Sequence, residues 1–168
     1  MERLRAVREN RPVPKKLPNT TIEFRQDAYL DSGYIANQEQ KMEIYRRLAA
    51  IEDEKTLTDL IDEVIDRFGT PSQPAEKLFR ISEIRVKARH LGIGSIIDEG
   101  DSLLVTWADE SFMHGWDPMK LPKTWLPYLK FLPGSPAKLR IHKTLIKGTM
   151  TDWMADFMDE LKRETGKQ

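Results

Sequence analysis

Two segments carry a helical repeat of apolar side chains that extends over several turns. Between residues 54 and 68 these side chains recur three and four positions apart, and Gly69 then favours a helix end. A second repeat begins at Pro74, a residue suited to a first helical turn, and stops at Gly92. The first predicted helix presents Leu57, Leu60, Ile61, Val64, Ile65 and Phe68, and the second presents Leu78, Ile81, Ile84, Ala88 and Leu91.

Two more helices are predicted from shorter patterns and from residues that can cap a helix. One covers residues 37–50, with Asn37 as cap, and the other covers residues 151–164, with Thr151 as cap and Asp152 in its first turn. The buried face expected of the first is Met42, Tyr45, Leu48 and Ala49, and that of the second is Trp153, Met154, Phe157, Met158 and Leu161.

Alternation with period two predicts strands in three places. Residues 20–25 form a short half-buried strand, residues 96–107 form a hairpin around a turn at 98–101, and residues 137–142 form a third strand. Five prolines within residues 111–136 exclude a long helix there. The order of elements predicts an α+β fold, in which helices pack on a small antiparallel or mixed sheet in a single compact domain.

Composition narrows the classes of function. The chain has 168 residues, 27 basic and 27 acidic, so its formal net charge is zero, which argues against a dedicated binder of nucleic acid or membrane. It lacks cysteine, and no apolar run approaches the length of a membrane span, so we expect a cytoplasmic protein. Residues 1–18 are basic and proline-rich and are predicted to be a linker, so that the domain covers residues 19–168.

Catalytic and metal-binding patterns are weak. The three histidines, His90, His114 and His142, fall on different predicted elements, with no spacing that requires them to converge. The glycine segments lack the order of a phosphate-binding loop, and no serine stands in a nucleophile elbow. We therefore expect a domain that is not an enzyme and that uses no metal or cofactor of its own.

The most charged segment is acidic. Seven acids fall between residues 52 and 66 against a single base, Lys55, which gives a local charge of minus six. A solvated helix face explains this pattern most simply. The alternative is a docking surface for an arginine-bearing partner, which would relieve the repulsion between neighbouring acids.

A basic segment follows at residues 120–147. Its lysines are interleaved with Trp116, Trp125 and Tyr128, a combination that also occurs in modules that contact single-stranded nucleic acid. The simpler interpretation places these rings in the core and the lysines in solvent. Nucleic-acid contact through the Lys-rich segment stays open as the alternative function.

Four segments together resemble the C-terminal domain of the bacterial transcription-repair coupling factor, an ATP-driven DNA translocase. They are DAYL with YI at residues 27–35, KMEIYRRLAA at 41–50, LIDEVIDRFG at 60–69 and IRVKARHLGI at 84–93. The resemblance runs from about Thr20 to Arg163. It departs at residues 31–33, where the family often has a proline, in an expected loop.

The resemblance implies a non-catalytic regulatory domain. In the family, ATP and Mg are used by the motor upstream, of which residues 1–18 would be the tail and linker. The domain folds back on the N-terminal UvrB-like module of the same polypeptide and masks the surface that recruits UvrA. It thereby restrains the translocase in transcription-coupled nucleotide excision repair. RNA polymerase and DNA are partners through the parent protein, and no membrane is involved.

The resemblance also assigns partner-binding residues. The family's contacts come from the acidic positions occupied here by Glu63 and Asp66, which face arginines of the N-terminal module, with Asp62 and Arg67 as neighbours. This interpretation requires both carboxylates to lie on the surface, with no cation of their own domain holding them.

Overall fold

A computed structural model describes residues 16–166, so most of the predicted linker, residues 1–15, lies outside the described residues. Within the described range the fold is α+β, as predicted. The elements are, in order, β1 (Thr21–Glu23), α2 (Gln38–Ala50), α3 (Glu54–Phe68), α4 (Gln73–His90), β2 (Ile93–Asp98), β3 (Ser102–Trp107), β4 (Leu129–Leu132), β5 (Lys138–His142) and α5 (Met150–Thr165).

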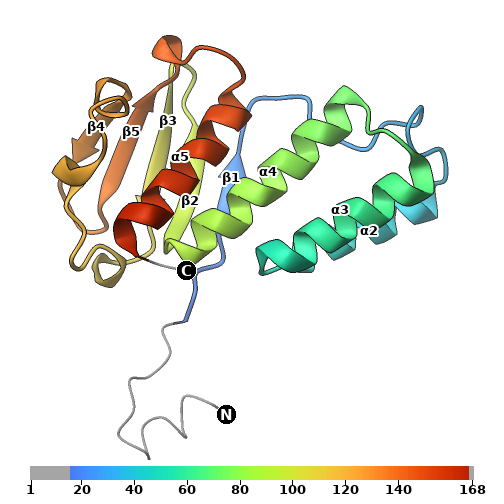
Figure 1. The fold of residues 1–168 in the computed structure, drawn as a ribbon, viewed down its shortest axis with the longest axis horizontal. Helices are drawn as coiled ribbons and strands as arrows, with labels where there is room; N and C mark the ends of the chain where they lie inside the picture. Colours follow the sequence, from blue (N-terminus) through green and yellow to red (C-terminus); the bar gives the residue numbers. More distant parts are fainter. Residues whose placement is uncertain (1–15, 167–168) are drawn as a thin grey trace, which may run out of the picture.

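The strands form one mixed sheet in the order β1-β2-β3-β5-β4. β1 runs parallel to β2, and the remaining pairs are antiparallel. Helices α4 and α5 lie side by side on one face of this sheet (Figure 1). The strand residues facing them are fully buried, and they are Ile96, Leu103, Val105, Leu139 and Ile141.

Helix α4 belongs to two hydrophobic cores. Its C-terminal half packs against the sheet and α5 through Ile84 and Ala88. Three more buried apolar side chains, Ala75, Phe79 and Val86, pack with α2 and α3, which lie beside α4 and away from the sheet (Figure 1). A helix that is covered on two sides has no single stripe, so the prediction from one repeat missed Phe79 and Val86.

The predicted face of α2 is right at Leu48 and Tyr45, which pack in or against the second core, and wrong at Met42 and Ala49. Lys41, Ile44 and Leu48 are buried, whereas Met42 is 47% exposed and Ala49 is exposed. A helix turns by about 100° per residue, so burying Ile44 directs Met42 about 200° away, into solvent. The Lys41 side chain replaces Met42 inside because its Nζ donates a hydrogen bond to Ser32 Oγ at 2.9 Å while its methylene groups pack.

Helix boundaries otherwise follow the sequence closely. Asn37 caps α2, and Gly69, with a φ of 81°, ends α3 as predicted. The cap of α5 is Thr149, so the prediction of Thr151 is wrong. Thr151 lies inside the first turn and is buried, which leaves it no position from which to cap the helix.

The region of residues 111–136 contains one element that the sequence did not indicate. Short 3-10 turns lead from β3 into β4, whose four residues lie between prolines and pair with β5. The aromatic rings of this region pack inward. Trp116 contacts Trp107 and Phe131, whereas Trp125 contacts Trp153 and Phe157 of α5.

Candidate functional site

The domain holds most of the acidic cluster with its own polar groups. Five of the seven acids have such a partner: Glu52 pairs with Arg89, Asp53 accepts from the backbone N–H of Thr56, Glu54 pairs with Lys162, Asp59 pairs with Lys55, and Glu63 pairs with Arg47. Three of these cations come from α2, α4 and α5, which are distant in the sequence. Counting charges along the segment therefore overstates the negative charge of this surface.

Glu63 is the most strongly held of these acids. Arg47 of α2 donates two hydrogen bonds to its carboxylate, at 2.7 and 2.5 Å, and Arg67 lies within 3.3 Å. The bonds from Arg47, followed by the charge of Arg47 and the contact with Arg67, lower the pKa of Glu63 to about 2. Glu63 thus lies on the surface, as a partner contact requires. However, Arg47 of its own domain holds the carboxylate, and the predicted contact required it to be free of such a cation.

Asp62 and Asp66 form the acidic pair that is left over. Both side chains are exposed, and neither makes a hydrogen bond or ion pair with any residue between 16 and 166. They are four residues apart on α3, so their charges repel each other. Asp66 also lies in the last helical turn, where the helix dipole disfavours a negative charge. The acidic pair therefore costs the isolated domain stability, and an external cation would remove that cost.

Arg67 does not extend the acidic pair. Its guanidinium contacts Glu63 and lies 5.0 Å from the ring centroid of Phe68. Of the four predicted partner-binding residues, the structure links Glu63 with Arg67 and leaves Asp62 and Asp66 open. That any of the four binds a partner stays a prediction.

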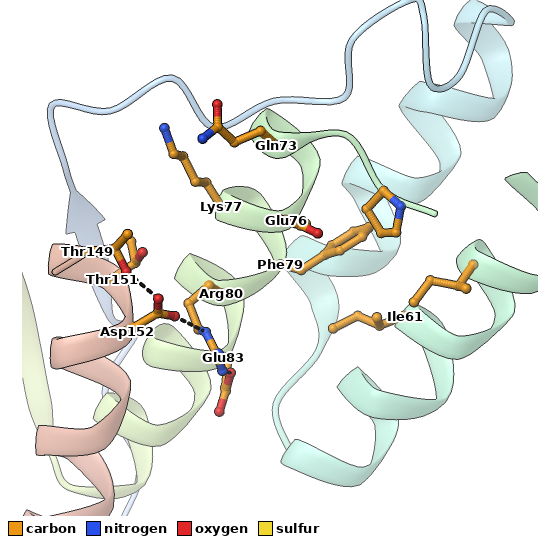
Figure 2. A pocket seen from close by; sticks show the side chains of 12 residues that line it. Ile61, Gln73, Glu76, Lys77, Phe79, Arg80, Glu83, Thr149, Thr151 and Asp152 are labelled. Carbon is orange, nitrogen blue, oxygen red and sulfur yellow. Dashed lines mark hydrogen bonds and ion pairs between the residues drawn. The ribbon is translucent and has the colours of Figure 1, made fainter. Parts of the chain in front are cut away.

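A groove runs along the side of α3 next to the acidic pair. It has a volume of about 570 Å³ and lies between α3, α4 and the beginning of α5 (Figure 2). Ile61 of α3 and Phe79 of α4 point toward each other in it, and Ile65 also lines it. Sequence reasoning missed this groove, because it assigned the whole apolar stripe of α3 to the core.

The Lys-rich segment has two parts in the structure. Lys130, Lys138 and Arg140 lie on β4 and β5 at positions that alternate with the buried ones, and Lys130 is opposite Arg140. Two of the basic side chains are held within the domain: Lys143 forms an ion pair with buried Asp98 at 2.8 Å, and Arg140 lies 3.4 Å from Glu99. The aromatic rings that accompanied these lysines in the sequence are packed against other rings: Tyr128 contacts Trp153 of α5, in addition to the contacts of Trp116 and Trp125.

No described helix has the length and apolar character needed to cross a membrane. The histidines lie apart, and His90 Nε2 is 2.9 Å from the backbone oxygen of Glu52. Among residues 16–166 there is no group of three or more side chains arranged to hold a metal ion.

Comparisons with known proteins agree with this architecture. Transcription-repair-coupling factors of Staphylococcus haemolyticus and Staphylococcus epidermidis are 38% and 39% identical to this chain over 104 and 103 residues. These matches cover 60% of this chain and 9% of each relative, so the chain corresponds to a small part of those proteins.

Structural similarity extends over almost the whole chain. A crystal structure of the C-terminal domain of transcription-repair coupling factor matches with a TM-score of 0.76 and 19% sequence identity. The match covers 92% of this chain and 99% of that one, and at this identity it establishes the fold. In sequence, the family model of the TRCF domain matches residues 24–115, more than half of the chain. The chain therefore belongs to the TRCF domain family and has the fold of the C-terminal domain of transcription-repair coupling factor.

Proposed function

We propose that this chain is a non-catalytic regulatory domain that binds the N-terminal UvrB-like module of a transcription-repair coupling factor. By binding this module it masks the UvrA-recruiting surface and restrains the ATP-driven translocase in the cytoplasm during transcription-coupled nucleotide excision repair. ATP and Mg belong to the motor of the parent protein, through which RNA polymerase and DNA are also engaged. The observation that carries the proposal is the acidic pair, Asp62 and Asp66, for which residues 16–166 provide no cation.

Arginine is the cation that best fits such a pair. Its planar guanidinium can donate two hydrogen bonds to one carboxylate, whereas the lysine ammonium acts as a point charge. Each exposed ion pair contributes only about 0.2–1 kcal/mol, so the acidic pair orients the partner more than it fixes it. Glu63 contributes less, because a partner arginine would have to compete with Arg47.

Weak contacts are sufficient when the partner belongs to the same polypeptide. With an effective concentration of ~1 mM and an intrinsic Kd of ~10 μM, the closed form outnumbers the open form by ~100-fold. That ratio corresponds to ~2.7 kcal/mol, which binding of RNA polymerase or DNA can reverse. A clamp of this strength is suited to regulation.

The proposal is tested in the full-length parent by reversing the charge of the acidic pair. Asp62→Arg with Asp66→Arg should raise both UvrA binding and ATPase activity, because the closed form loses its contacts. Asp156→Arg, which makes one such change at an exposed position of α5, serves as the control. If UvrA binding and ATPase activity both stay at wild-type levels while the domain remains folded, the proposed function is wrong.

Contact with nucleic acid is a second candidate, favoured by Lys130 and Lys138, which are exposed on the neighbouring strands β4 and β5. Such a surface would bind phosphates, and its affinity would fall steeply with salt. Electrophoretic binding of this chain to single- and double-stranded DNA over a salt series separates the candidates. Submicromolar, salt-dependent binding that is lost in Lys130→Glu with Lys138→Glu would favour the second one.

A further inference from the structure

The wall that α3 gives to the groove is apolar, whereas most of the side chains that line it from α4 and α5 are polar. Ile65 is 37% exposed although it belongs to the apolar stripe of α3. The second core buries Leu57, Leu60 and Val64 of this stripe, and Ile61 packs partly against it, whereas Ile65 belongs to neither core. Ile61 and Ile65 line the groove together with the buried Phe79 (Figure 2).

The charges around the groove are unbalanced. Arg80, on the α4 wall, is held by Asp152 of α5 at 3.0 Å and by Glu83 at 2.7 Å, so it is not available to a ligand. The ionic groups near the groove that lack a partner within residues 16–166 are three acids and one base: Asp62, Asp66, Glu76 and Lys77. Asp62 and Asp66 directly follow Ile61 and Ile65 on α3, so an apolar strip and an acidic strip run in parallel.

We propose that the groove receives an aliphatic side chain of the UvrB-like module that is flanked by arginines reaching the acidic pair. The inference rests on the proposed function and names the chemistry of the partner segment. Contacts at an interface divide between exposed charges, which steer association, and a desolvated anchor, which slows dissociation. The acidic pair provides the charges that steer association, and Ile61, Ile65 and Phe79 provide the site for the desolvated anchor.

The lack of cysteine in this chain allows a direct footprint of the groove. Ile65→Cys introduces a single thiol into the groove, and Met42→Cys introduces one at a similarly exposed position of α2 outside it. The alkylation rate of each variant is measured with and without the purified UvrB-like module. With the module at ten times its Kd for each variant, alkylation of Ile65→Cys should slow by about tenfold, and that of Met42→Cys should not change.

The outcomes separate the two proposals. If the module binds, and Asp62→Asn with Asp66→Asn weakens that binding, but Ile65→Cys reacts equally fast in the complex, the groove is not occupied and only the proposed function stands. If the module does not bind the wild-type chain, both proposals fail. If Ile65→Cys becomes protected as the chain is concentrated without the module, a second copy fills the groove, and the inference is overturned.

Discussion

Arg47 and Glu63 join α2 to α3 through two hydrogen bonds, and this pairing divides the acidic face of α3 into two parts. Glu63, on the side toward α2, belongs to the fold. Asp66, only three residues later, is exposed and unpaired within the described range. The same helix thus contributes one carboxylate to a contact within the fold and leaves another exposed, with no cation bound to it among residues 16–166.

The Arg47–Glu63 pair should make the thermal stability of the domain depend on pH. The pKa of Glu63 falls from its ordinary value of 4.5 to about 2 in the folded state. Because the pKa is lowered in the folded state, the stabilisation that the Arg47–Glu63 pair provides is fully present above pH 4.5 and is lost as the pH falls toward 2. The difference in Tm between the wild-type chain and Glu63→Gln should therefore be constant from pH 7 to about 5 and should vanish near pH 2.

Glu23→Gln is the control for this titration, since Glu23, at the end of β1, is exposed and makes no ion pair with any residue between 16 and 166. Its Tm should follow that of the wild-type chain across the whole pH range. A Glu63→Gln difference that persists unchanged at pH 2 would show that the pair does not act through its charge.

The acidic pair should be unfavourable for the isolated domain. Asp66→Lys removes the repulsion with Asp62 and places a positive charge in the last turn of α3, where the helix dipole favours it. We expect the free energy of unfolding, measured with urea, to rise by about 0.3–1 kcal/mol. A decrease would indicate that Asp66 has a stabilising contact in the domain, and would remove the argument that it is kept for a partner.

The contact between α4 and α5 depends on a buried cation. Lys87 has a side chain only 6% exposed and lies 2.7 Å from Glu83 and 2.8 Å from Asp159. Burial disfavours its charge, but the hydrogen bonds to Asp159 and Glu83 outweigh burial and raise the pKa of Lys87. Lys87→Ala should lower the free energy of unfolding by about 2–3 kcal/mol, since Asp159 loses its cation and Glu83 keeps only Arg80.

The exposed Lys55–Asp59 pair provides the control for Lys87. Lys55→Ala should leave the urea midpoint close to that of the wild-type chain, because exposed ion pairs contribute little. Equal losses from Lys55→Ala and Lys87→Ala would contradict the role given to burial.

Gly92, between α4 and β2, should tolerate no side chain. Its φ is 77°, and a Cβ atom built there would overlap the ring of Phe112. Gly69 has a similar φ of 81°, with nothing within 4 Å of such an atom. Gly92→Ala should therefore cost about 3 kcal/mol or more, whereas Gly69→Ala should cost about 1–2 kcal/mol, as measured by thermal unfolding.

The elements that the sequence predicts well are those whose signals are local. Helix α3 begins and ends as expected because Asp53 and Gly69 mark its ends and its apolar repeat is regular. The hairpin of β2 and β3 follows from alternation around a turn. Strand β4 could not be predicted, because four residues between prolines carry no period and depend on pairing with β5.

The candidate site was predictable only in part for the same reason. The acids of α3 are visible along the sequence, but the cations that hold them come from other helices. Arg47 is 16 residues from Glu63, and Lys162 is 108 residues from Glu54. Only the tertiary structure separates the acids that serve the fold from Asp62 and Asp66.

The central claim is that the acidic pair binds arginines of the UvrB-like module, and a charge swap between the two proteins tests it most directly. Calorimetric titration would measure the Kd of the chain for the module, with Asp62→Arg and Asp66→Arg on one side and arginine-to-glutamate variants on the other. We expect each change alone to weaken binding and one combination of the two to restore it. Undiminished binding by the double variant of this chain, with its fold intact, would show that the acidic pair does not bind those arginines.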